Sequence, residues 1–94
     1  MYSFPSDIER LKISEVAKAM LMVLQREYKG RKRKVPSGAL AYILKERFPE
    51  IFESYSSVDT MKGWLSNVGK MLVRKGLIKG ERNYVWSFWT EEKT

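Results

Sequence analysis

The sequence contains no cysteine and no histidine among its 94 residues. Without cysteine there are no disulfide bonds and no thiolate nucleophiles, and without both residue types zinc fingers are excluded. Imidazole acid–base catalysis and its metal sites are excluded for the same reason. We therefore expect a domain that binds a partner, is not an enzyme, and uses no cofactor, metal ion or small-molecule ligand.

Long apolar segments are also missing. No run approaches the roughly 18–20 residues that a membrane span requires, and the first residues lack the pattern of a signal peptide. The apolar share of 44% is ordinary for a globular chain. We expect one domain with no membrane partner, located in the cytoplasm and associated with the nucleoid. With few Gln and Asn and many Lys, Glu and Arg, the composition also resembles that of thermophile proteins.

Acidic residues are scarce relative to basic ones: Asp and Glu total 11 against 18 Lys and Arg, which gives a net charge of +7. The excess is concentrated in two segments, residues 29–34 and residues 60–82, which carry +5 each, so the rest of the chain carries −3. A solvated surface explains a single charge cluster, but two clusters in so small a domain favour a polyanionic partner.

The first predicted helix spans residues 6–29, where apolar residues recur at helical spacing. Ser6 and Glu9 fit a capping box at its start. Ser14 offers an alternative cap, which would leave a short turn before a helix at about 15–28. The sequence leaves both starts open.

A second helix is predicted over residues 37–48, with Ser37 as its cap. Pro49 cannot continue this helix and ends it. Residues 49–55 are too few for a standard helix, so we expect a turn or a single loop of 3₁₀ helix there.

The third helix is predicted over residues 57–75. Ser56 and Asp59 stand in capping-box register, and Gly76 occupies a normal position for a helix end. Its apolar residues step by three and four, which is the cleanest amphipathic pattern in the chain: Val58, Met61, Leu65, Val68 and Leu72.

A two-stranded β-hairpin is predicted over residues 77–89. Residues 77–79 form a short extended run, residues 80–83 carry turn residues, and residues 84–89 are rich in β-branched and aromatic side chains. Alternation along the second strand favours Trp86 and Phe88 as the inward-facing residues.

The aromatic residues invite comparison with stacking platforms for single-stranded nucleic acid. At helix and strand spacing such side chains are more often core residues, and we expect this for Trp64, Trp86, Phe88, Phe48 and Phe52. Trp89 on the other strand face would join Tyr2 and Phe4 in an apolar surface near both termini. A homodimer is the partner that such a surface would allow.

The fold class that follows is α+β and mostly helical: a three-helix bundle with a C-terminal two-stranded β-hairpin, flanked by tails at residues 1–5 and 90–94. This order of elements resembles the winged helix-turn-helix family of DNA-binding domains. Residues 37–89 carry the resemblance, and its local hallmark is the sequence LVRKGLIK over residues 72–79. The connector over residues 49–57 is longer than the turn of a minimal helix-turn-helix.

The resemblance implies that the third helix enters the major groove of double-stranded DNA, with the hairpin as a wing on the flanking backbone. The candidate DNA-binding residues on the helix are Thr60, Lys62, Gly63, Ser66, Asn67, Lys70 and Arg74. Those on the wing are Lys79 and Arg82, and those on the basic loop are Arg31, Lys32, Arg33 and Lys34.

The corresponding function is that of a transcriptional regulator. The alternatives are a winged-helix module that docks another protein and an RNA-binding protein that uses the basic loop. The sequence does not separate these three.

Overall fold

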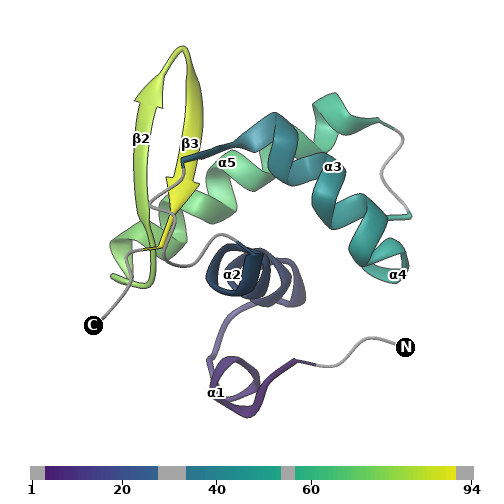
Figure 1. The fold of residues 1–94 in the computed structure, drawn as a ribbon, viewed down its shortest axis with the longest axis vertical. Helices are drawn as coiled ribbons and strands as arrows, with labels where there is room; N and C mark the ends of the chain where they lie inside the picture. The colour runs from purple at the N-terminus through teal and green to yellow at the C-terminus, as the bar shows by residue number, and fades with distance from the viewer. Residues whose placement is uncertain (1–3, 28–33, 54–56, 91–94) are drawn as a thin grey trace.

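The computed structural model describes residues 4–27, 34–53 and 57–90, with α-helices packed beside a small antiparallel sheet (Figure 1). Within these ranges the elements are α1 (Ser6–Glu9), α2 (Glu15–Glu27), β1 (Val35–Pro36), α3 (Ser37–Arg47), α4 (Pro49–Phe52), α5 (Val58–Arg74), β2 (Lys79–Asn83) and β3 (Val85–Trp89). The predicted α+β, mostly helical class is therefore confirmed. No helix in the described ranges is long and apolar enough to cross a membrane.

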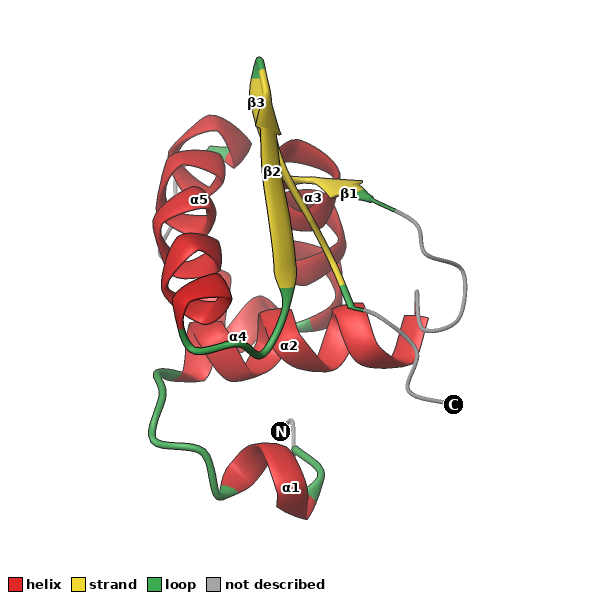
Figure 2. Cartoon of the chain, turned by 90° about the vertical axis from the view of Figure 1, so that its left-hand side faces the viewer, coloured by secondary structure: helices red, strands yellow, loops and turns green. Residues whose placement is uncertain are grey.

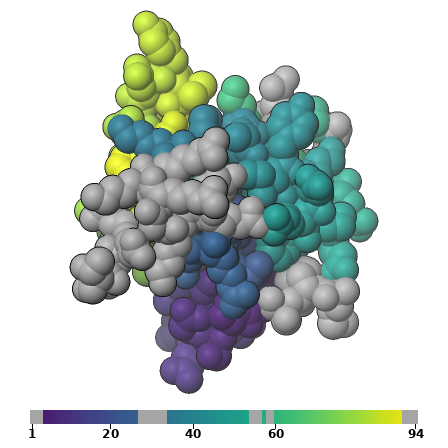
Figure 3. Space-filling view, viewed as in Figure 1, coloured from purple at the N-terminus to yellow at the C-terminus, as the bar shows by residue number. Residues whose placement is uncertain are grey.

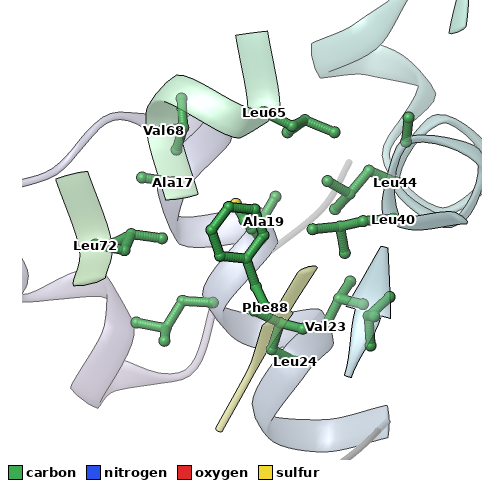
Figure 4. Close-up of a cluster of buried hydrophobic side chains, with 14 of the residues drawn as sticks. Ala17, Ala19, Val23, Leu24, Leu40, Leu44, Leu65, Val68, Leu72 and Phe88 are labelled. Atoms are coloured by element: carbon green, nitrogen blue, oxygen red, sulfur yellow. The ribbon is translucent and has the colours of Figure 1, made fainter. Parts of the chain in front are cut away.

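The core lies where α2, α3 and α5 meet the sheet. Phe88 from β3 is fully buried at its centre, surrounded by side chains from all three helices (Figure 4). The amphipathic pattern of the third predicted helix is confirmed, because the following residues of α5 are all buried: Met61, Leu65, Val68 and Leu72. The side chain of Val58 lies outside the described residues.

The predicted first helix is two helices. Ser14 caps α2, since its hydroxyl accepts a hydrogen bond from the Ala17 amide at 3.3 Å. The capping box at Ser6 and Glu9 is wrong: Pro5 occupies the N-cap position of α1, so Ser6 already lies inside the helix and makes no cap. Of the two starts that the sequence allowed, the structure has the one with a short turn before the longer helix.

Helix α3 begins without a side-chain cap. Ser37 is its first residue and Pro36 takes the N-cap position, because β1 runs directly into the helix with extended backbone at Pro36. The cap predicted at Ser37 is therefore wrong. The connector after α3 contains the single helical turn α4, whose Phe52 is fully buried.

Helix α5 begins at a cap one residue later than predicted. The Ser57 hydroxyl accepts from the Thr60 amide at 3.2 Å, whereas Ser56 and the side chain of Asp59 lie outside the described residues. Gly76 ends the helix with a φ of 75°. The amides of Gly76 and Leu77 donate back to carbonyls of the last turn at 2.9 and 3.1 Å. This is a Schellman motif, in which the left-handed φ favours glycine.

The sheet has a third strand and a later turn than predicted. β1 pairs with β3, and the strand order is β1-β3-β2. Pro36 is tolerated because β1 is an edge strand. Residues 80–83 belong to β2, and the chain reverses at Tyr84, which has a φ of 68°. Gly80 faces the Phe88 ring, so its small size serves packing where the sequence had predicted a turn.

Both ends of the described chain are held by the fold. The Phe4 ring stacks on Phe48 with centroids 6.0 Å apart. Thr90 is buried, and its hydroxyl donates to the carbonyl of Leu24 at 3.2 Å. The sequence assigns Thr90 to the C-terminal tail of residues 90–94, and for Thr90 that assignment is wrong. It fixes the end of β3 to α2.

Candidate nucleic-acid interface

An open groove of about 360 Å³ lies between α5 and the hairpin formed by β2 and β3. Figure 2 shows these two elements side by side, with the hairpin rising beyond the helices. We call this space the α5–hairpin groove. It is lined by Ser37, Lys62, Gly63, Ser66, Lys70, Arg82, Tyr84, Val85 and Trp86.

Five of the residues predicted from the sequence line this groove, namely Lys62, Gly63, Ser66, Lys70 and Arg82. Lys62, Ser66 and Lys70 are four residues apart, so they form one stripe along α5. Arg82 faces them from β2, on the same side of the hairpin as Trp86, its cross-strand partner. Residues 20 apart in sequence thus share one surface.

The groove has a single sign of charge. Its described lining contains two lysines and one arginine and no acidic residue. Within the described part of the chain, none of these three cations forms an ion pair. A concave surface of this kind concentrates positive potential and attracts a polyanion.

Ser66 contributes less than predicted. Its hydroxyl donates to the carbonyl of Lys62 at 3.0 Å, which is a common use of serine inside a helix. The Ser66 oxygen keeps its capacity to accept a hydrogen bond, but its donor is already used. Thr60 is similar, because its hydroxyl lies 3.0 Å from that of Ser57 at the helix cap.

Asn67 and Arg74 are exposed on α5 but do not line the groove. Asn67 follows Gly63 by four residues and Arg74 follows Asn67 by seven, which places all three on one outward stripe of the helix. This outward stripe adjoins the groove stripe. The exposed face of α5 is therefore continuous from the hairpin side to Arg74.

Lys34 and Lys79 lie on the other face of the hairpin. Alternation along β2 turns Lys79 and Glu81 away from the side that carries Arg82. The Lys34 ammonium lies 2.8 Å from the Glu81 carboxylate and 5.3 Å from the ring centroid of Trp89. The structure thus separates these two cations from the groove. The other predicted residues of the basic loop lie outside the described residues: Arg31, Lys32 and Arg33.

The core prediction is wrong for Trp64 and holds in part for Trp86, which packs against the core. Trp64 is 47% exposed and Trp86 only half-buried, whereas Phe48, Phe52 and Phe88 are core residues as predicted. Trp64 lies one residue beyond the groove-facing Gly63, and a Cβ at Gly63 would meet nothing within 4 Å.

The apolar surface predicted near the termini is not formed by the described residues. Phe4 stacks on Phe48 at the end of α3, and Trp89 lies on the hairpin against Lys34. These two sites are on different parts of the molecule (Figure 1). Tyr2 lies outside the described residues.

Sequence reasoning missed several residues that shape the groove. Ser37, Tyr84, Val85 and Trp86 line it. Gly69 lies behind it, where a Cβ would overlap the Phe88 ring. For Gly69 the sequence carries one signal, a glycine inside an otherwise strong helix pattern, which often marks close packing. For Ser37 no signal was available, because its place depends on how α3 meets α5.

Tyr84 at the hairpin tip is 98% exposed and has a left-handed backbone. The space-filling view shows the hairpin projecting from the body (Figure 3). A bulky residue at positive φ is a backbone outlier, and such strain is typical of functional positions.

Metal binding has no candidate in the described part of the chain, where no group of three acidic side chains comes together. The chain matches no protein-family model, no curated protein and no solved structure.

Proposed function

We propose that the chain is a winged-helix domain that binds double-stranded DNA and acts as a transcriptional regulator. The order of α2, α3, α5 and the hairpin supports the winged-helix assignment. In this proposal α5 enters the major groove, whose width admits one helix, and the hairpin lies along the flanking backbone. The cytoplasmic, nucleoid-associated location predicted from the sequence goes with this function.

The observation that carries the proposal is the α5–hairpin groove. Lys62 and Lys70 on one wall and Arg82 on the other are complementary in charge to a phosphate strand. The described lining of the groove contains no acidic residue. The outward stripe of Gly63, Asn67 and Arg74 is then free for base edges, where the Asn67 amide suits adenine.

The test is a salt titration of duplex binding. Affinity for a short fluorescein-labelled duplex of mixed sequence is measured by anisotropy over a range of salt concentrations. The logarithm of affinity should fall linearly with the logarithm of salt, by about 0.9 per phosphate neutralised. Absence of binding to this duplex at low salt would contradict the proposal.

A pair of charge-matched variants localises the interface. Lys62→Gln with Arg82→Gln removes two cations from the groove, and Arg10→Gln with Lys12→Gln removes two exposed cations beyond α1. α1 lies at the end of the molecule opposite the hairpin tip (Figure 1). The groove variant should flatten the salt dependence by about 1.8 in slope, and the control should leave it nearly unchanged.

The other two functions are decided by competition. Stronger binding to structured RNA than to the duplex would favour the RNA-binding alternative. Weak binding that ignores base sequence in a selection from random duplexes, together with co-purification of a partner, would favour the protein-docking module.

A further inference from the structure

Lys70 differs from the other lysine of the groove in what lies beneath it. Its ammonium is 5.6 Å from the ring centroid of Trp86, within the range of a cation–π interaction. Both residues line the α5–hairpin groove. The Lys70 ammonium on α5 thus contacts the opposite wall of the groove through the Trp86 ring on β3.

Trp86 is itself held in place by the core. Its ring stacks on Phe88 with centroids 5.8 Å apart and planes 4° apart. Phe88 is fully buried, and its ring lies so close to Gly69 and Gly80 that a Cβ at either position would crowd it. Lys70 therefore rests on a Trp86 ring that stacks on Phe88. Phe88 in turn packs against the backbone of α5 at Gly69 and of β2 at Gly80.

Lys62 provides the internal comparison. It lines the same groove and carries the same charge, but it forms no cation–π interaction among the described residues. Its stem passes beside Gly38, which offers contact without a directional partner for the ammonium. A free lysine loses considerable rotamer entropy when a ligand fixes it. A lysine already fixed in the right place loses less, and binding is favoured accordingly.

We propose that Trp86 is a positioning residue that orders Lys70 in the groove, so that Lys70 contributes more to duplex affinity than Lys62 does. This inference rests on the proposed function. It assigns to Trp86 a role through Lys70, which a double-mutant cycle separates from direct contact with DNA.

The cycle uses the labelled duplex and four proteins: wild type, Trp86→Leu, Lys70→Met and the double variant. Trp86→Leu should weaken binding roughly two- to fivefold, as expected from the strength of an exposed cation–π contact. It should leave the slope against salt unchanged, because no charge is removed. In the Lys70→Met background the same change should have almost no effect.

Lys62 supplies the matched control. Trp86→Leu should keep its full effect in a Lys62→Met background, because Trp86 does not act on Lys62. Trp86→Phe retains an aromatic face and should restore most of the affinity. If instead Trp86→Leu costs as much without Lys70 as with it, the positioning role is wrong.

A measurement without DNA separates this inference from the proposed function. Ring currents of Trp86 should shift the Lys70 side-chain methylene protons upfield in the free protein, and Trp86→Leu should abolish that shift. Unfolding in urea checks that the variant is folded. Failure of wild type to bind the duplex would overturn the proposed function and with it the affinity role of Lys70. Unshifted Lys70 protons in a duplex-binding protein would overturn the positioning role alone.

Discussion

The two basic clusters carry the same net charge, yet the tertiary structure gives them different surroundings. In the cluster of residues 60–82, Lys62, Lys70 and Arg82 line a groove in which the described residues include no acid. In the cluster of residues 29–34, the described member, Lys34, pairs with Glu81 at 2.8 Å. Glu81 itself belongs to the other cluster in sequence. Net charge over a segment therefore says little about the charge available to a ligand.

The difference arises from the two faces of the hairpin. Alternation along β2 sends Arg82 toward α5 and Glu81 to the opposite side. The inner face of the hairpin thus carries Arg82 and no acidic residue, whereas the outer face carries Glu81, which pairs with Lys34.

The largest effect is expected for Gly69→Ala, which changes the packing between α5 and the inner face of the hairpin. A Cβ at this position would overlap the ring of the fully buried Phe88, so helix and hairpin must move apart. We expect a loss of about 3 kcal/mol or more in the free energy of unfolding, the upper range for overpacking a core. Urea unfolding measures it, and duplex binding should weaken with the displaced hairpin.

Gly63→Ala is the control on the same helix. Nothing lies within 4 Å of a Cβ there, so alanine should raise stability by up to about 1 kcal/mol through its better helix propensity. Equal losses for the two variants would mean that Phe88 does not pack against Gly69.

Charge removal on the two faces gives the next largest effect. Lys70→Gln should lower the magnitude of the salt slope by about 0.9, as for one lost phosphate contact. Lys34→Gln removes a cation that already forms an ion pair with Glu81, so its effect on the salt slope should be much smaller. Anisotropy titrations over a salt series compare them. Equal changes in slope would show that both faces contact the duplex.

Tyr84 stands at the tip where the two faces meet. Tyr84→Gly should stabilise the fold by about 1 kcal/mol, because glycine accepts the φ of 68° without the steric cost that tyrosine has. Tyr84→Ala keeps that cost and should leave stability nearly unchanged, since the side chain is 98% exposed. Thermal unfolding of both variants is the measurement, and a stabilised alanine variant would argue against backbone strain.

The smallest effect is expected for Glu81→Gln on the outer face. Lys34 and Glu81 have side chains about half exposed, and exposed ion pairs contribute about 0–1 kcal/mol. Stability should therefore change by at most about 0.5 kcal/mol. Duplex affinity should rise slightly at low salt, because Lys34 is released and one negative charge is lost. An unchanged affinity would place the outer face away from the duplex.

Much of the helical part of the fold was predictable from the sequence. The alternate steps of three and four residues in α5 determine its buried face, since each helical turn returns the chain to the same side. Pro49 marked a helix end because proline lacks the amide hydrogen that a helix needs, and Gly76 because glycine accepts a left-handed φ. The starts of α1 and α3 were not predictable in the same way, because Pro5 and Pro36 take the N-cap positions that serine was expected to fill.

The wall of the groove on α5 was predictable from the sequence, but the wall on the hairpin was not. A helix stripe at intervals of four, Lys62, Ser66 and Lys70, follows from the sequence. Which stripe the hairpin would lie beside does not, because it depends on the close approach of Gly69 and Gly80 to Phe88. The position of the hairpin turn in turn decides which side chains of β2 face α5.

The sequence alone is enough to predict a small basic domain without Cys or His, with an amphipathic third helix and a C-terminal hairpin. Those properties depend on composition and on local periodicity, which are complete within a short segment. Which of the described cations pair with an acidic residue depends instead on how the elements pack. Ion pairing depends on contacts such as Lys34 with Glu81, 47 residues apart, and such contacts exist only once the elements have packed.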